Sequence, residues 1–283
     1  MTKWNLIVDV EKCNNCNNCF LAVADEYQGN DHPGYAAPMP KHGHHWFDIL
    51  RHERGQGLMT DIAHVPVMCQ HCDDAPCIRE AHNEAIAKRD DGIVIIDPEK
   101  ARGQQHLVEV CPYGAIWWNE ELGLPQHWIF DAHLLDRGWK EPRCVQSCPT
   151  GALKSLKVDD DKMAQVVEAE GLEAFNPELP TRPRVHYKNL YRYKTCFIGG
   201  SIAVVVDGVE DCLEGATVLL YHDGERVAEA FTDTYGDFKF DKLEAGSGGY
   251  TVEVMHPDYQ SKTVSAELGE SITLGVIRLD GRG

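Results

Sequence analysis

The sequence predicts an α+β chain in which a cysteine-rich half, built from repeated modules, precedes a small all-β domain. In the first half, a pattern of short strand, cysteine loop and Cys-Pro pair recurs. From Gly199 onward, short alternating runs of polar and apolar residues replace it, bounded by Gly and Asp turns as expected for strands. The length of 283 residues suits about two domains.

The first module contains a triple of cysteines close to the N-terminus. A short strand over 5–10 leads into the triple, and a short helix over 20–26 follows it. In bacterial iron–sulfur proteins the spacing C-x2-C-x2-C wraps a loop around one corner of a cluster, and the fourth ligand comes from a distant Cys-Pro pair. This module therefore predicts three cluster ligands, Cys13, Cys16 and Cys19.

A second triple, with the spacing C-x2-C-x4-C, consists of Cys69, Cys72 and Cys77. A short apolar strand over 92–97 follows, and then the ending C-P-x-G-A at 111–115, which recurs at 148–152. Two triples and two Cys-Pro endings predict a duplicated ferredoxin-like 4Fe-4S domain. A zinc ribbon, the alternative, does not account for two such endings.

Other spacings indicate that cluster sites have been lost. In duplicated ferredoxins the fourth Cys of each run binds the cluster of the other loop. The positions three residues beyond the two triples hold Val23 and Ala81 instead. The triple expected before Cys111 falls on Ala101, Gln104 and Leu107. One complete site is therefore absent.

The loop over 28–46 contains several histidines but no pair at helical i, i+4 spacing on an apolar face. We expect these histidines to be solvated or to lie at an interface rather than to bind metal: His32, His42, His44 and His45.

The second half divides at two composition changes. We expect a ferredoxin-like domain over 1–157, a helix (159–170) with an extended, Pro- and Tyr-rich linker arm over 158–198, and an antiparallel β-sandwich or barrel over 199–283. About seven strands are expected in the last domain, with a hairpin turn at Asp223-Gly224. This domain shows no catalytic constellation.

Charge and composition exclude two classes of partner. Lys and Arg number 27 against 45 for Asp and Glu, a formal net charge of −18. No basic surface is available to neutralise phosphates, so neither nucleic acid nor an anionic membrane is expected as a partner. No signal peptide and no run of about 18 apolar residues is present, so we expect a cytoplasmic protein without a membrane span. Reduced thiols then favour metal binding over disulfides for the 11 cysteines.

These motifs resemble the four-cluster ferredoxin-like subunits of the dimethyl sulfoxide reductase family of molybdenum enzymes. In that family the last loop reads C-x2-C, a spacer of about a dozen residues, then C-x3-C-P. Here DAHLLDRGWKEPRCVQSCP matches the spacer and ending, but the leading pair falls on Trp128 and Asp131, so a second site is lost and Cys144 is left as its only thiol. The resemblance assigns Cys148 to the first triple and Cys111 to the second; exchange of these two fourth ligands is the alternative.

Over the whole chain, the sequence is similar to the small subunits of pyrogallol–phloroglucinol transhydroxylases and resorcinol-type hydroxylases of anaerobic aromatic degradation. The stretches that carry this are MTKWNLIVDVEKC, HPGYAAPMPKHGHHW, DDGIVIIDPEKARG, TRPRVHYKNLYRY and the β-domain, which itself resembles transthyretin-like and carboxypeptidase-regulatory-like modules. The family resemblance implies three clusters. The departures at Val23, Trp128 and Asp131 predict two, and a third would have to use Cys144 and Asp131.

The resemblance implies a heterodimer. The large partner would hold molybdenum on two pterin guanine dinucleotides and bind a phenol, while this chain would supply clusters, a docking surface and no catalytic residue. Electrons would pass to an unidentified soluble acceptor. Two alternatives are an electron-transfer subunit of another enzyme of the dimethyl sulfoxide reductase family, and a scaffold subunit with structural clusters.

Overall fold

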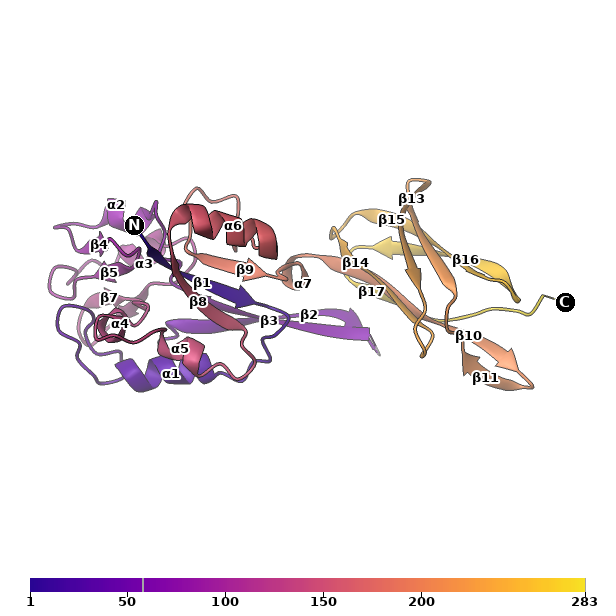
Figure 1. Ribbon diagram of the computed structural model, residues 1–283, viewed down its shortest axis with the longest axis horizontal. Helices are drawn as coiled ribbons and strands as arrows, with labels where there is room; N and C mark the ends of the chain where they lie inside the picture. Colours follow the sequence, from indigo (N-terminus) through magenta and orange to yellow (C-terminus); the bar gives the residue numbers. More distant parts are fainter. Residues whose placement is uncertain (58, 283) are drawn as a thin grey trace. The chain divides into compact units, whose positions relative to one another are not determined.

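A computed structural model describes residues 1–57 and 59–282, and the chain divides into two compact units (Figure 1). Unit 1 comprises Met1–Arg51 and Ala63–Leu190, and unit 2 comprises His52–Ile62 and the chain from Tyr191 onward. None of the helices among the described residues has the length and apolarity needed to cross a membrane.

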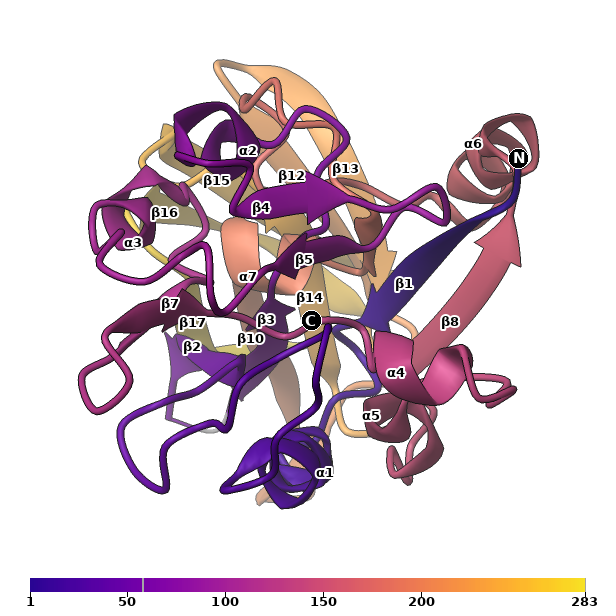
Figure 2. The ribbon, with the colours of Figure 1, turned by 90° about the vertical axis from the view of Figure 1, so that its left-hand side faces the viewer.

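A three-stranded sheet forms the centre of unit 1 (Figure 2). Its middle strand is β1 (Lys3–Asp9), which pairs antiparallel with β8 (Leu153–Val158) and parallel with β9 (Val185–Lys188). The helix α6 (Asp160–Glu170) covers one face of this sheet, where Met163 and Leu172 pack against Ile7. The Asp159 side chain caps α6 by accepting a hydrogen bond from the Lys162 amide, which confirms the helix predicted there.

Short elements on either side of this sheet carry the cysteines. They are α1 (Asn18–Tyr27), α2 (Pro76–Glu80), β4 (Ile86–Lys88), β5 (Val94–Ile96), α3 (Leu107–Val110), β6 (Trp117–Asn119), β7 (Leu124–Gln126), α4 (Ala132–Leu135) and α5 (Arg143–Gln146). The pairs β4–β5 and β6–β7 form two-stranded antiparallel sheets. Buried Ile86, Ile96 and Leu107 form a core cluster against which Cys77 and Cys111 pack.

The segment expected to be a linker arm instead contributes β9, and its preceding residues pair with the second cysteine loop. The Arg184 amide donates to the Gln70 carbonyl at 2.8 Å, and the Arg184 guanidinium bonds to the Asp73 carboxylate. These contacts lie within unit 1. The domain limits at 157 and 198 stay a proposal.

The sequence analysis did not predict the long hairpin of β2 (Phe47–Gln56) and β3 (Met59–Met68). The two strands begin and end in unit 1, but the segment His52–Ile62 belongs to unit 2. Both strands mix charged, apolar and intermediate positions, so neither shows the clean alternation of a half-buried strand.

Two four-stranded sheets form most of unit 2. In one, β10 (Cys196–Val206) pairs with β11 (Val209–Cys212), β14 (Asp237–Leu243) and β17 (Ile272–Arg278); in the other the order is β13 (Glu225–Phe231), β12 (Thr217–His222), β15 (Gly248–His256), β16 (Tyr259–Leu268). The seven predicted strands are confirmed, and β11 is an eighth. Apolar side chains from both sheets share one core cluster, which includes Ile198, Val218 and Val252.

Two details of unit 2 bear on the predictions. Asp223 and Gly224 have φ values of 49° and 83°, as the predicted tight hairpin between β12 and β13 requires. The expected purely antiparallel pairing is interrupted, because β17 pairs parallel to β10. A short helix, α7 (Tyr191–Lys194), precedes β10.

A buried arginine joins the hairpin segment to β14 inside unit 2. The Arg54 side chain, only 2% exposed, donates to Asp61 at 2.7 and 2.9 Å and to Asp241 at 2.7 and 2.9 Å. Burial alone would raise the pKa of Asp61, but hydrogen bonds from Arg192 and Arg54 outweigh burial and bring this pKa to about 2. The charge of Asp61 is therefore present in the folded chain at all physiological pH values.

The change Arg54→Met should destabilise unit 2 by about 3–5 kcal/mol, because it leaves two partly buried carboxylates without their cation. The Asp61 pKa is lower in the folded than in the unfolded chain, so this loss is full at neutral pH and shrinks as the pH falls through about 2. Hydrogen–deuterium exchange of the β10 and β14 amides measures it. The exposed pair Arg226–Glu229 supplies the control, since Arg226→Met should change stability by less than about 0.5 kcal/mol. Equal effects of both changes would contradict this prediction.

Candidate functional site

Four cysteines of the first set line one small cavity in unit 1. Cys13, Cys16, Cys19 and Cys148 surround a volume of about 290 Å³, together with Pro66, Leu153 and their neighbours. Burial raises the pKa of the Cys19 thiol to about 12, and electrostatic interaction with the other three sulfurs raises it further. The structure thus places Cys148, rather than Cys111, beside the first triple.

The backbone of the first loop is shaped to turn its sulfurs inward. Asn15 and Asn17 both have a φ of 60°, the left-handed conformation that Asn adopts more readily than most residues. The helix α1 begins directly afterwards, which puts Cys19 in its first turn. Reciprocal hydrogen bonds of 3.3 Å between Asn18 and Ser147 tie this loop to the segment that carries Cys148.

The second set gathers in the same way. Burial raises the pKa of Cys72 to about 12, and interaction with Cys69 and Cys111 acts in the same direction. The pKa of Cys77 is raised by burial and then by Cys69, Cys111 and Cys72. Eight cysteines therefore form two groups of four, in the pairing that the resemblance assigns. Their role as cluster ligands stays a prediction.

The two C-P-x-G-A endings fold alike. Gly114 and Gly151 have φ values of 61° and 65°, and each amide donates to the carbonyl of the preceding cysteine, Cys111 or Cys148. A residue with a side chain rarely adopts this φ, which explains glycine at the fourth position of both endings. The backbone amides of Tyr113, Gly114 and Ala115 interact with the Cys111 sulfur and lower its pKa, although burial outweighs them.

This arrangement fits iron–sulfur clusters. A buried thiol is costly to ionise by itself, so a cation must compensate the negative charge of the thiolate. Cluster iron supplies that compensation, and amides directed at sulfur stabilise the remaining charge. Eight thiols in two groups, partly or fully buried and lined by amides, have the donor chemistry that two 4Fe-4S clusters require.

One cation is built into the second loop. Lys88 Nζ donates to the carbonyls of His71 and Cys72 at 2.8 and 3.0 Å and lies 2.9 Å from the Asp73 carboxylate. Burial raises the pKa of Cys69 to about 11, and the Lys88 ammonium acts in the opposite direction. Lys88 therefore places positive charge close to the second group of sulfurs, a feature that the sequence analysis missed.

The degenerate fourth site is filled by side chains. Val23, Trp128, Asp131 and Cys144 are all 1% exposed or less. The Trp128 ring packs against Phe47 and Phe130 at centroid distances of 4.9 and 4.8 Å. Aromatic packing thus occupies the position where the resemblance expects a cluster.

Asp131 has a complete set of hydrogen-bond partners. Its Oδ1 accepts from Tyr27 Oη at 2.7 Å and from Trp128 Nε1 at 3.2 Å, and its Oδ2 accepts from the Arg143 amide at 2.8 Å. The Cys144 thiol is fully buried, and burial followed by the nearby Asp131 raises its pKa well above the ordinary value. Both residues therefore serve the packing of this region.

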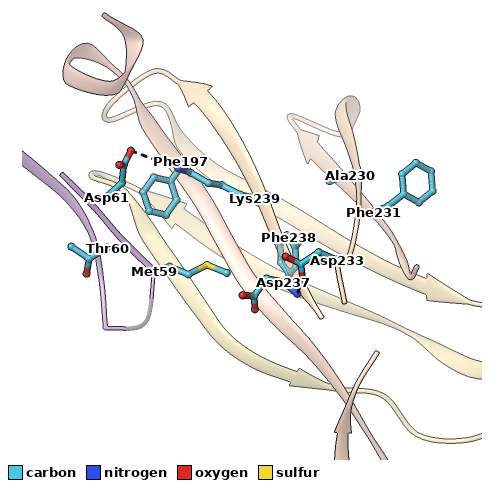
Figure 3. Close-up of a pocket in the computed structure, with 10 residues that line it drawn as sticks. All are labelled: Met59, Thr60, Asp61, Phe197, Ala230, Phe231, Asp233, Asp237, Phe238 and Lys239. Carbon is cyan, nitrogen blue, oxygen red and sulfur yellow. Dashed lines mark hydrogen bonds and ion pairs between the residues drawn. The ribbon is translucent and has the colours of Figure 1, made fainter. Parts of the chain in front are cut away.

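Unit 2 contains a pocket of about 780 Å³ between the hairpin segment and the sheets (Figure 3). Its polar groups already have partners. Lys239 lies 3.0 Å from Asp241 and 4.3 Å above the Phe197 ring, and Asp237 accepts from the Ser201 hydroxyl at 2.5 Å. Asp233 accepts from the Tyr235 and Asp237 amides, which makes this segment a turn. The lining shows no nucleophile–base pair, so the pocket does not suggest catalysis.

Comparison with known proteins agrees with this site. A family model described as a 4Fe-4S dicluster domain matches residues 60–157, and one described as a carboxypeptidase regulatory-like domain matches residues 203–279. The duplicated cysteine sets and the appended β-domain define the class: an iron–sulfur electron-transfer subunit of a molybdenum enzyme.

Relatives narrow the class to one family. The chain is 44% identical to the pyrogallol hydroxytransferase small subunit of Pelobacter acidigallici, over 99% of this chain and 100% of that protein. It is 24% identical to the iron–sulfur subunit of the arsenate respiratory reductase of a Shewanella species, over 68% of this chain and 98% of that protein. It is also 28% identical to one chain of the anaerobic dimethyl sulfoxide reductase of Escherichia coli, over 56% and 76%. The chain belongs to the family of pyrogallol hydroxytransferase small subunits.

The change Asp131→Ala should destabilise unit 1 by about 3–5 kcal/mol without any loss of iron, because it leaves three buried donors without an acceptor. Anaerobic thermal unfolding and iron analysis of the same samples measure the two effects. The exposed Asp90 provides the control, and Asp90→Ala should leave stability within about 0.5 kcal/mol. Loss of iron from the Asp131 variant would instead mark Asp131 as a ligand of a third cluster.

Proposed function

We propose that the chain binds two 4Fe-4S clusters and carries electrons between a molybdenum centre on a large partner subunit and a soluble acceptor. The first cluster is held by Cys13, Cys16, Cys19 and Cys148, and the second by Cys69, Cys72, Cys77 and Cys111. The observation that carries this proposal is the gathering of the eight thiols into two groups of four. Such clusters accept and release one electron at a time.

The chain's own residues hold and tune this route. Buried sulfurs keep the clusters away from water, backbone amides donate to sulfur, and Lys88 adds a positive charge beside one of the two groups. No residue of the chain is assigned to substrate chemistry. The large partner would hold molybdenum on two pterin guanine dinucleotides, and this chain would dock against it in a heterodimer.

We infer that the substrate of the complex is a hydroxylated aromatic of the pyrogallol or resorcinol type. The identity of 44% to a pyrogallol hydroxytransferase small subunit supports this inference. Hydroxylation with water-derived oxygen would release two electrons into the clusters, whereas transhydroxylation would leave them between the two phenols. A cytoplasmic location, where thiols stay reduced, completes the proposal.

Two other functions lead to different observations. An electron-transfer subunit of a respiratory reductase would belong to a complex that reduces an inorganic or sulfoxide substrate, so purified complex inactive on phenols would favour it. A scaffold subunit would hold clusters that are not reduced at any accessible potential. Anaerobic redox titration of the complex separates the scaffold from an electron carrier.

Iron analysis of the anaerobic complex tests the cluster count and the ligands together. Two clusters predict about eight iron atoms in this chain, and three predict about twelve. Cys16→Ala and Cys77→Ala should each remove about four, because each change removes one ligand of a different cluster. Cys144→Ala and the exposed Cys212→Ala should remove none. Twelve iron atoms in the native chain, or loss of iron on changing Cys144, would show that the count of two is wrong.

The change Lys88→Met should make the midpoint potential of the second cluster more negative, because a positive charge stabilises the reduced cluster, which carries one more electron. Redox titration followed by electron paramagnetic resonance measures both clusters in one sample. Lys140 is exposed, and Lys140→Met is the matched control. An unchanged potential in the Lys88 variant, with iron content intact, would contradict this prediction.

A further inference from the structure

Three potential metal ligands that are far apart in the sequence meet beside α1 in unit 1. They are Glu26 at the end of α1, His32 in the loop that follows, and His133 in α4. Glu26 Oε1 lies 2.8 Å from His133 Nε2 and 3.9 Å from His32 Nε2. One ligand atom from each residue lies within 4.8 Å of the other two.

These separations suit one small ion. Zinc binds His nitrogen and carboxylate oxygen at about 2.0–2.2 Å, so two ligands of a tetrahedral ion stand about 3.4 Å apart. The two distances from Glu26 Oε1, 2.8 and 3.9 Å, lie on either side of that value. Small side-chain rotations would therefore bring all three groups to bonding distance.

The loop geometry and burial favour a built site. The His32 amide and carbonyl both bond to Ala36 at 3.0 Å, which closes the turn that carries the His32 ring. The His133 side chain is 1% exposed, whereas those of Glu26 and His32 are 16% and 12% exposed. His133 Nδ1 is buried and has no hydrogen-bond partner. An ion could thus enter from the side of Glu26 and His32.

The charges around the site leave one carboxylate oxygen available. Arg143 Nη1 donates to Glu26 Oε2 at 2.5 Å and fixes the carboxylate, so that Oε1 faces the two rings. Such an outer partner orients a metal-binding carboxylate. Burial lowers the pKa of His133, which keeps this imidazole neutral and able to bind metal at neutral pH.

We propose that Glu26, His32 and His133 bind one divalent transition-metal ion, such as Zn²⁺, separate from the iron of the clusters. Two imidazoles and one carboxylate are ligands that zinc and other late first-row metals accept, and three protein ligands leave a position for water. The proposal goes beyond the electron-transfer function and does not depend on the cluster count.

The site lies next to the degenerate cluster position. Tyr27 follows Glu26 and donates to Asp131, which is two residues before His133. Arg143 bonds to Glu26 through its side chain and to Asp131 through its amide. The metal would link α1, the His32 loop and α4 in the region where the family layout expects a cluster to link Val23, Trp128, Asp131 and Cys144. Its role is therefore a structural cross-link.

A competing explanation is an ion-pair network without metal. Arg143, Glu26 and His133 form a chain of hydrogen bonds that satisfies the carboxylate, and His32 Nε2 lies 3.2 Å from the Glu26 carbonyl. In such a network His32 would add little. In a metal site His32 supplies a third of the protein ligands, so the consequence of removing it distinguishes the two explanations.

The experiment uses the anaerobic heterodimer with its iron in place. Equilibrium dialysis against buffered free Zn²⁺, followed by mass-spectrometric metal analysis, counts zinc and iron in each sample. The proposal predicts one zinc ion per small subunit that is absent or bound at least about 10-fold more weakly in His32→Ala and Glu26→Gln, with iron unchanged in all samples.

His106→Ala is the matched control. His106 also lies beside a second imidazole, His82, at a ring distance of 5.1 Å, and its removal should leave the zinc count of the native complex unchanged. Equal zinc binding by the native and His32→Ala complexes would overturn the proposal. So would zinc that appears only in proportion to lost iron, because that zinc would occupy the cluster cysteines.

Discussion

Eight cysteines that must ionise in poorly solvated surroundings are the constraint on which unit 1 depends. Burial raises the pKa of Cys19 and Cys72 to about 12, so the free thiols would stay protonated at neutral pH. The loops nevertheless direct amides at sulfur and place Lys88 beside the second group. Short helices, tight turns and left-handed residues in unit 1 are all placed to meet this requirement.

The lost cluster position shows what replaces a cofactor when its ligands disappear. A cluster joins several chain segments, so its removal leaves a gap that the chain must fill. Here Trp128 supplies the volume, and Asp131 accepts three hydrogen bonds that join α1, its own loop and the segment of α5. The site thus keeps its cross-linking role through neutral packing and one buried carboxylate.

Cysteine spacing is local information, which is why both triples, both endings and the fold class could be predicted from the sequence alone. The same is true of the Asp223-Gly224 hairpin and the seven main strands. The hairpin of β2 and β3 was missed because its strands lack clean alternation, and the meeting of Glu26 with His133 was missed because 107 residues separate them. Such contacts depend on the packing of several elements, which no short sequence pattern encodes.

The hairpin segment His52–Ile62 has a consequence for synthesis on the ribosome. It is made about 130 residues before the rest of unit 2 begins at Tyr191, a delay on the order of ten seconds at cellular elongation rates. During that interval Arg54 and Asp61 have no access to Asp241, which emerges later still. The β-domain therefore completes its fold only by recruiting a segment that has waited in the nascent chain, and it cannot be exchanged between proteins as one contiguous cassette.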